Sequence, residues 1–192
     1  MPELVRCNTS SSNGDTRSAA NLIKNFLDAE NIEYEEVSAC KTMPNIISTT
    51  NMAKSGKHLM LNGHLDVMPA GNEPGWSVNP YSGTIKDGKI IGRGTSDMKA
   101  GVTAMLFTYK YLQRFKNELS GKLSLTSVSD EETGWGRGTG FLFKKIPEHL
   151  IRDLKELENF PVEIPSELRE FLDQDGYREM HEKVRAADIG DT

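Results

Sequence analysis

Apolar residues recur at helical spacing in two stretches of the chain. Residues 15–30 and residues 98–115 each place their apolar side chains on one stripe. The stripe positions are Ala19, Leu22, Ile23, Phe26 and Leu27 in the first stretch, and Val102, Met105, Leu106, Tyr109 and Leu112 in the second. This spacing predicts two amphipathic helices. The polar residues Ser11, Ser12 and Asn13 are candidate caps for the first helix.

Shorter apolar runs predict β-strands between and after these helices. The strand candidates are residues 32–37, 45–50, 57–62 and 122–128. The run Leu59-Met60-Leu61 is typical of a buried strand. Two further short strands flank Asp87-Gly88, a pair of residues that favours a hairpin turn. Because helices and strands alternate, the sequence predicts an α/β fold, a layered sheet with flanking helices.

The composition changes near Ile146. Residues 1–145 carry 17 basic and 15 acidic side chains, a net charge of +2, whereas residues 146–192 carry 6 and 13, a net charge of −7. Fifteen of the 17 glycines precede this boundary. In the second piece one helical stripe comprises Leu150, Ile151, Leu154, Leu157 and Phe160. We therefore expect one domain at residues 1–145 and an acidic helical tail at residues 146–192.

The overall composition excludes several classes of protein. A chain of 192 residues can bury a core without disulfides, and its net charge of −5 argues against a nucleic-acid or anionic-membrane partner. Its two cysteines, Cys7 and Cys40, form no CxxC pair, which favours a reducing compartment. The sequence contains no apolar run as long as a membrane span and no signal-peptide-like start. These features predict a soluble, cytoplasmic protein.

Acidic and imidazole side chains gather in three clusters that follow predicted strands. The clusters are residues 63–66, 92–99 and 130–134. In an open α/β sheet, binding sites assemble where the strands end. Although 66 residues separate His64 from Asp130, we therefore expect the clusters to converge.

Histidine, aspartate and glutamate without cysteine form the ligand set of a catalytic zinc or of a pair of borderline metal ions. In this interpretation His64 binds metal through one ring nitrogen, while Asp66 holds the other ring N–H. Asp97 bridges two ions roughly 3.5–4 Å apart, and Glu132 completes one of them. On an extended backbone, neighbouring side chains point to opposite sides. Glu131 therefore does not point the same way as Glu132 and is free to act as general base.

Each cluster also has a plainer interpretation. A lone His-x-Asp is usually a surface pair, and Glu-Glu is usually a solvated charge run, so alone each has a prior of about one in ten of being functional. Gly92-x-Gly94 could suggest a phosphate cradle, but Asp97 stands where the last glycine belongs and would repel phosphate. The aromatic-rich loop with Trp76, Pro80 and Tyr81 is more simply ordered structure than a substrate contact.

Taken together, the clusters resemble the dinuclear zinc amidohydrolases, the family of acetylornithine deacetylase, succinyl-diaminopimelate desuccinylase, aminoacylase and glutamate carboxypeptidase. Residues 61–67, LNGHLDV, resemble the first metal motif of that family. Residues 85–101 are similar to the segment with its bridging aspartate, and residues 130–139 are similar to its catalytic-glutamate motif. The resemblance spans roughly residues 4–143, and the order and spacing of the three motifs make it specific.

The resemblance implies metal ligation by His64, Asp97 and Glu132, catalysis by Glu131, and orientation of His64 by Asp66. It implies two Zn²⁺ ions in a complete site, with cobalt or manganese as alternatives. It further implies hydrolysis of an N-acyl or peptide amide next to a carboxylate, in a small N-acyl amino acid or peptide.

Some features of the family are not recognisable in this chain. The family has a further acidic ligand, a lid and dimerisation domain, and a last histidine ligand, whereas only 52 residues follow Gly140. We therefore expect a truncated zinc-peptidase-like fold: a partial catalytic metallohydrolase domain at residues 1–145, each metal lacking one protein ligand, and the acidic helical tail.

Two functions stay open at this point. One is an incomplete zinc-dependent amidohydrolase, and the other is a truncated, non-catalytic fragment that binds metal or a partner without turnover. A protein-interaction module ranks last, because it rests only on the acidic helices. The truncated sheet also predicts an exposed strand edge through which the chain self-associates.

Overall fold

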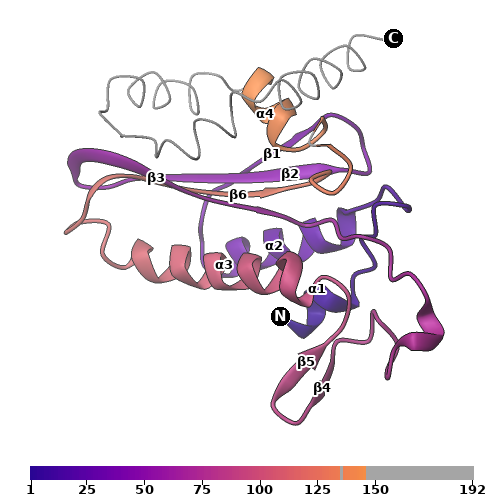
Figure 1. Ribbon diagram of the computed structural model, residues 1–192. Helices are drawn as coiled ribbons and strands as arrows, with labels where there is room; N and C mark the ends of the chain where they lie inside the picture. The colour runs from indigo at the N-terminus through magenta and orange to yellow at the C-terminus, as the bar shows by residue number, and fades with distance from the viewer. Residues whose placement is uncertain (135, 146–192) are drawn as a thin grey trace, which may run out of the picture. The chain divides into compact units, whose positions relative to one another are not determined.

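The computed structural model describes residues 1–134 and 136–145 (Figure 1). These residues belong to one compact unit, Met1–Lys145. The predicted acidic helical tail at residues 146–192 lies outside the described residues, so the division into a catalytic domain and a tail stays a prediction. No helix in the described part of the chain is long and apolar enough to cross a membrane.

A four-stranded sheet forms the centre of this unit, in the order β1, β2, β6, β3. Its strands are β1 (Glu35–Ser38), β2 (Pro44–Asn51), β3 (Lys54–His64) and β6 (Ser120–Val128). β2 pairs with β1 and β6 in antiparallel orientation, whereas β3 and β6 are parallel neighbours. Because these two strands run in the same direction, the loops that follow them emerge at the same edge of the sheet.

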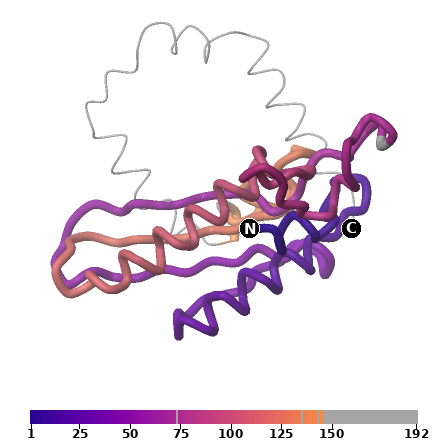
Figure 2. The backbone as a smooth tube through the Cα atoms, turned by 90° about the horizontal axis from the view of Figure 1, so that it is seen from below, coloured from indigo at the N-terminus to yellow at the C-terminus, as the bar shows by residue number. Residues whose placement is uncertain are grey.

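Two helices, α2 (Arg17–Ala29) and α3 (Ala100–Gln113), cover one face of the sheet (Figures 1 and 2). Their fully buried stripe positions are Ala19, Ile23, Leu27, Val102, Leu106 and Tyr109. The rings of Phe26 and Phe107 join the two helices edge to face, with centroids 5.4 Å apart. The two amphipathic helices and the α/β class are therefore confirmed. Two short helices, α1 (Pro2–Arg6) and α4 (Thr139–Lys145), were not predicted.

The predicted hairpin is present as β4 (Thr84–Lys86) and β5 (Lys89–Ile91). The turn residues Asp87 and Gly88 have φ angles of 51° and 71°. Such a turn requires positive φ at both positions, which explains why the Asp-Gly pair signals it in the sequence.

The start of α2 differs from the prediction. The helix begins after Thr16, whose side chain makes no capping bond and instead shares a buried 2.6 Å hydrogen bond with the hydroxyl of Ser129. The carboxylate of Asp15 accepts the N–H of Arg17 at 3.0 Å and so satisfies one free donor of the first turn. The three candidate caps lie in the turn before this point: Ser11, Ser12 and Asn13.

β3 is an edge strand and not the buried strand that its apolar run predicts. Leu59 is 54% exposed, whereas β6 is buried from Leu123 to Val128. The difference arises because β6 has strands on both sides, while β3 has β6 on one side within residues 1–134 and 136–145. The prediction of a buried strand is therefore wrong for the described residues.

Candidate metal centre

The sheet brings two of the three clusters together. β3 ends at His64, directly beside Val128 at the end of β6, and the N–H of Leu65 donates to the Val128 carbonyl at 2.8 Å. Residues 130–132 therefore emerge next to residues 64–66. The third cluster arrives on the irregular turn Thr95–Lys99 that leads into α3.

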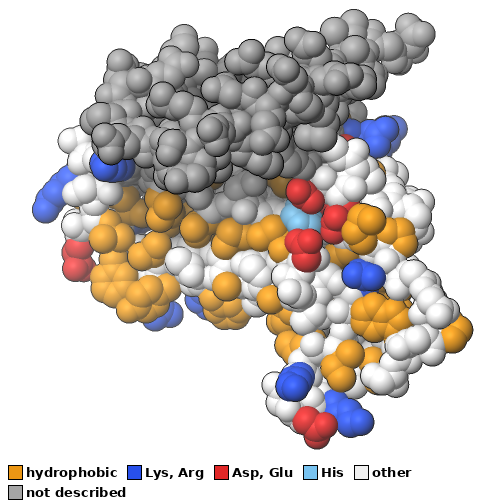
Figure 3. Space-filling view, viewed as in Figure 1, with side chains coloured by type: hydrophobic (Ala, Val, Ile, Leu, Met, Phe, Trp, Pro, Cys, Tyr) orange, Lys and Arg blue, Asp and Glu red, His pale blue; other side chains and the backbone are white. Residues whose placement is uncertain are grey.

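The three clusters converge on the imidazole of His64. Its Nε2 lies 3.1 Å from Oδ1 of Asp97 and 3.8 Å from Oε2 of Glu131. His64, Glu131 and Glu132 also offer one ligand atom each within 4.8 Å of one another. Figure 3 shows a histidine on this face with acidic side chains around it. The expected convergence is therefore present in the structure.

The buried His64 ring has a defined tautomer. Its Nδ1 lies 2.9 Å from the backbone carbonyl oxygen of Asp66 and 3.6 Å from the Asp66 carboxylate. Because a carbonyl oxygen can only accept, Nδ1 carries the proton, and the lone pair of Nε2 in the neutral ring points toward the carboxylates.

Asp66 has a second function that the sequence did not indicate. Its buried carboxylate accepts the backbone N–H of Glu131 at 3.1 Å and that of Glu132 at 2.9 Å. Asp66 therefore links the loop after β3 to the turn after β6 through these two hydrogen bonds. Sequence reasoning assigned Asp66 only to the His64 ring, because nothing in a local motif reveals a bond between residues 65 positions apart.

The two glutamates lie in a turn, so the expectation that an extended backbone directs them apart is wrong. Asp130 has a φ angle of 70°, which ends the strand geometry before Glu131. Both glutamate carboxylates consequently face the His64 ring. Oε1 of Glu132 also accepts the N–H of Met68 at 3.2 Å. The assignment of Glu131 as base and Glu132 as ligand stays a prediction.

The electrostatics reflect one imidazole among several carboxylates. Burial lowers the pKa of His64, but Asp66 and Asp97 outweigh it and raise that pKa to about 9. Burial, followed by the charge of Asp97, raises the pKa of Glu132. For Asp66, burial acts to raise the pKa, but hydrogen bonds from His64 and from two backbone N–H groups lower it. A bound cation would relieve this excess of negative charge.

The donor set fits a zinc-like ion. Atoms bound at about 2.1 Å to one tetrahedral ion lie roughly 3.4 Å apart, close to the 3.1 Å that separates His64 Nε2 from Asp97 Oδ1, and one carboxylate oxygen of Glu132 lies within 4.8 Å of a His64 ring nitrogen. Imidazole and carboxylate ligands suit zinc and its borderline neighbours. The residues in place therefore fit a metal ion of this kind.

Neighbouring loops fix the position of the Asp97 turn. The buried Lys99 donates to the carbonyl of Cys7 at 2.7 Å, and burial lowers its pKa to about 8. The indole of Trp76 donates to Ala70 at 3.0 Å, and the Arg93 guanidinium lies 5.5 Å from the centre of the Trp76 ring. The interpretation of the loop with Trp76, Pro80 and Tyr81 as ordered structure is confirmed.

An α/β sheet that assembles imidazole and carboxylate groups at one edge is an arrangement in which a catalytic metal ion can bind. The chain belongs to the peptidase family M20/M25/M40, whose sequence model matches residues 60–183. The family resemblance seen in the sequence is therefore confirmed.

Two relatives and one solved structure show the extent of the similarity. The chain is 37% identical over 136 residues to succinyl-diaminopimelate desuccinylase of Sulfurovum sp. (strain NBC37-1), covering 71% of this chain and 33% of the relative. It is 30% identical over 173 residues to succinyl-diaminopimelate desuccinylase 2 of Ruegeria sp. (strain TM1040), covering 89% and 41%. The M20 family metallo-carboxypeptidase Sso-CP2 from Sulfolobus solfataricus superposes with a TM-score of 0.59 at 28% identity, covering 69% and 30%. The chain thus spans between 30% and 41% of the length of these proteins.

Proposed function

We propose that this chain carries the metal-binding part of an amidohydrolase that cleaves an N-acyl or peptide amide next to a carboxylate. The observation that carries the proposal is the placement of His64 Nε2 at 3.1 Å from the Asp97 carboxylate, with Glu131 at 3.8 Å. The substrate class is supported by the names of the relatives, which are succinyl-diaminopimelate desuccinylases.

In this proposal His64, Asp97 and Glu132 hold the metal, with two Zn²⁺ ions in a complete site and cobalt or manganese as alternatives. Bound zinc would polarise the scissile carbonyl and lower the pKa of the attacking water. The support for zinc is the donor set of one imidazole and several carboxylates without a thiolate.

The remaining residues move protons and maintain geometry. Glu131 accepts the proton of the attacking water on its carboxylate and then delivers it to the leaving amine. Asp66 is a positioning residue, because it holds His64 through Nδ1 and the glutamate turn through two backbone N–H groups. Both functions depend on the turn that places the two glutamates beside the imidazole.

For the 192-residue chain alone we propose metal binding with turnover far below that of a full-length relative. The carboxylate of Asp97 is 75% exposed and that of Glu131 is 39% exposed. Water therefore has free access to groups that a closed active site would shield, which weakens their electrostatic effect. A metal-binding chain without turnover is the second candidate, favoured by the same exposure. We place either function in the cytoplasm, since Cys7 and Cys40 are both free thiols.

Metal content tests the ligand assignment. Zinc bound after dialysis, measured by inductively coupled plasma mass spectrometry, should fall several-fold in His64→Ala and stay unchanged in His58→Ala. His58 is a matched control, because it lies on the same strand and bonds to Ser124 at 2.8 Å away from the cluster. Equal zinc content in both variants would refute a metal site at His64.

A second pair of variants distinguishes the functions of Glu131 and Glu132. Glu131→Gln should retain zinc and abolish any hydrolysis of N-succinyl or N-acetyl amino acids, because an amide cannot accept the proton of water. Glu132→Gln should lower the zinc content. Equal metal loss in both variants would show that the two functions are misassigned. Equal rates of hydrolysis for amides with and without a neighbouring carboxylate in the substrate would contradict the proposed substrate class.

A further inference from the structure

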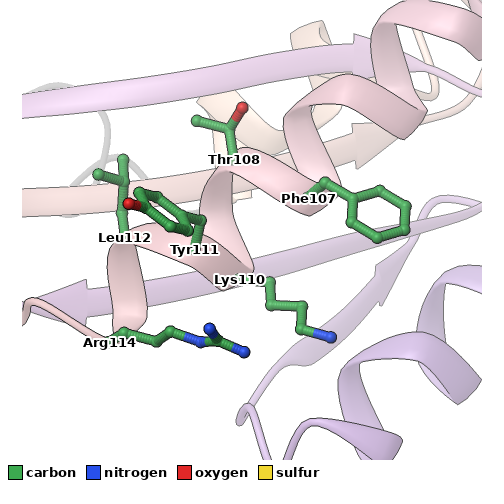
Figure 4. A pocket seen from close by; sticks show the side chains of 6 residues that line it. All are labelled: Phe107, Thr108, Lys110, Tyr111, Leu112 and Arg114. Carbon is green, nitrogen blue, oxygen red and sulfur yellow. The ribbon is translucent and has the colours of Figure 1, made fainter.

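Outside the metal centre, the described residues contain a hollow along α3 and a cluster of buried polar side chains beside the glutamate turn. The hollow, of about 490 Å³, is lined by six side chains between Phe107 and Arg114 (Figure 4), and none of them belongs to the three acidic clusters. The buried polar side chains are all at most 4% exposed: Thr16, Asn45, Ser129 and Asp130. Because a buried polar group is costly unless it is hydrogen-bonded, the partners of these side chains show what they hold in place.

Asn45 is fully buried at the start of β2 and forms three hydrogen bonds through its side-chain amide. Its Oδ1 accepts the N–H of Ser129 at 2.8 Å. Its Nδ2 donates to the carbonyl oxygens of Val37 at 3.0 Å and Arg137 at 2.9 Å. These partners fix the orientation of the amide, because an N–H can only donate and a carbonyl oxygen can only accept. Among side chains of this length, only asparagine offers both an acceptor and two donors.

The hydrogen bonds of Asn45 close the turn that carries the two glutamates. The chain leaves β6 at Ser129 and returns to it at Gly138, where a Cβ would collide with the Ser129 carbonyl oxygen. Asn45 bonds to both ends of this turn, at Ser129 and at Arg137. Within the turn, the Asp130 carboxylate accepts the N–H of Arg137 at 2.9 Å. The base of the glutamate turn is therefore bonded to β2.

The glutamate turn has a second attachment on the side of His64. There the Asp66 carboxylate accepts the N–H groups of Glu131 and Glu132. Asp66 follows β3, whereas Asn45 lies on β2, and these two strands flank β6 in the sheet. Attachments to both neighbours of β6 fix the position and the direction of the turn, whereas one attachment alone would leave it free to pivot.

We propose that Asn45 is a positioning residue for the metal centre. By bonding to both ends of the turn, it sets the direction in which Glu131 and Glu132 approach the His64 ring. This inference rests on the proposed function, in which these glutamates bind metal and move protons. Removal of the amide would leave one N–H and two carbonyl groups without their partner in a buried place. The turn would then adopt several positions, and Glu132 would meet the metal ion in only some of them.

The zinc affinity of the full 192-residue chain tests the proposal. Asn45→Ala should weaken zinc binding about 10–100-fold, the usual effect of removing a side chain that supports a metal ligand. Ser48→Ala is the matched control and should bind zinc as the wild type does. Ser48 is also buried on β2, but its hydroxyl bonds to the Glu33 carbonyl at 2.6 Å and to the Tyr109 hydroxyl at 2.9 Å.

Both affinities are measured by competition with a chelating dye, at a temperature at which circular dichroism shows the variants folded. Equal zinc affinity in Asn45→Ala and Ser48→Ala would overturn the proposal.

Double-mutant cycles separate the positioning of Glu132 from a general loosening of the chain. If Asn45 acts through Glu132, its substitution should cost little further zinc affinity once Glu132→Gln has removed that ligand. Asp97 lies on the separate turn before α3, so in the Asp97→Asn background Asn45→Ala should still cost about 10–100-fold. Losses of equal size in both backgrounds would show a purely structural role and overturn the proposal.

Hydrogen exchange of the metal-free chain provides a measurement that needs no zinc. In Asn45→Ala the N–H groups of Glu131 and Glu132 should exchange at least about ten times faster relative to that of Leu65, which bonds to the end of β6. Ser48→Ala should leave this ratio unchanged. If Asn45→Ala does not fold, Asn45→Ser should show the same change at smaller size, because its hydroxyl retains one donor and one acceptor. An unchanged ratio would refute the positioning role.

The two measurements distinguish the failure of this inference from the failure of the proposed function. A wild-type chain that binds no zinc would refute the proposed function, and hydrogen exchange would then still decide whether Asn45 holds the glutamate turn. Zinc binding by the wild type together with undiminished affinity in Asn45→Ala would refute this inference and leave the proposed function intact.

Discussion

Replacement of Asp66 by asparagine should destabilise the metal-free chain by about 2–4 kcal/mol. The Asp66 carboxylate accepts two backbone N–H groups, from Glu131 and Glu132, at 3.1 Å and 2.9 Å. Hydrogen bonds to a charged group contribute about 1.5–3 kcal/mol each, and a neutral amide oxygen can replace one of them only in part. The second N–H would face an amide NH₂ group and lose its acceptor in a buried place.

The same substitution should lower the pKa of His64. Asp66 supplies most of the interactions that raise this pKa to about 9, so Asp66→Asn should move it back toward the ordinary histidine value. Urea denaturation in the presence of EDTA measures the stability, and NMR titration of the imidazole protons measures the pKa. Asp87→Asn is a suitable control, because asparagine is equally favoured in that exposed hairpin turn. A loss of stability below about 0.5 kcal/mol, a difference typical of surface substitutions, together with an unchanged pKa of His64, would refute the positioning role of Asp66.

Three further predictions concern the fold. Because the pKa of His64 is about 9 in the folded chain and near 6.5 when unfolded, its contribution of about 3 kcal/mol should be complete below about pH 6.5. That contribution should be lost as the pH rises through 9, which urea denaturation of the metal-free wild type and of His64→Gln at several pH values would reveal. Gly138→Ala should prevent stable folding, because the new Cβ would collide with the backbone carbonyl oxygen of Ser129, and a soluble variant with an unchanged melting temperature would contradict this. Tyr109→Phe should cost about 1–2 kcal/mol, since the buried hydroxyl bonds to two hydroxyl groups of β2 at 2.9 Å and 3.0 Å, while the same change at the exposed Tyr111 should have no measurable effect on the denaturation midpoint.

The parts of the fold that depend on local spacing could be predicted from the sequence. The apolar stripes gave the positions of α2 and α3, and Asp87-Gly88 marked the hairpin between β4 and β5. The convergence of residues 63–66 with residues 130–134 was also predictable, because both follow parallel strands of one sheet. Residues 92–99 instead follow the separate hairpin and reach His64 on the turn before α3, which the strand-end rule does not explain.

Features that depend on neighbours distant in the sequence could not be predicted. The apolar run of β3 is typical of an interior strand, but its exposure is set by the order of strands in the sheet. The direction of the two glutamates depends on the positive φ of Asp130, which no spacing in the sequence reveals. The side chain of Thr16 forms a hydrogen bond with a serine 113 positions away and therefore does not cap α2.

The parallel pairing of β3 with β6 also bears on when the proposed metal site forms during folding. His64 and the two glutamates come together only when His64 stands opposite Val128. A slip of one residue would turn the imidazole to the other face of the sheet, away from the carboxylates. Parallel strands far apart in the sequence pair late, because a long loop must close first. The proposed zinc binding should therefore appear only in the last stage of refolding, and a chelating dye that competes for zinc would report when the correct strand register has formed.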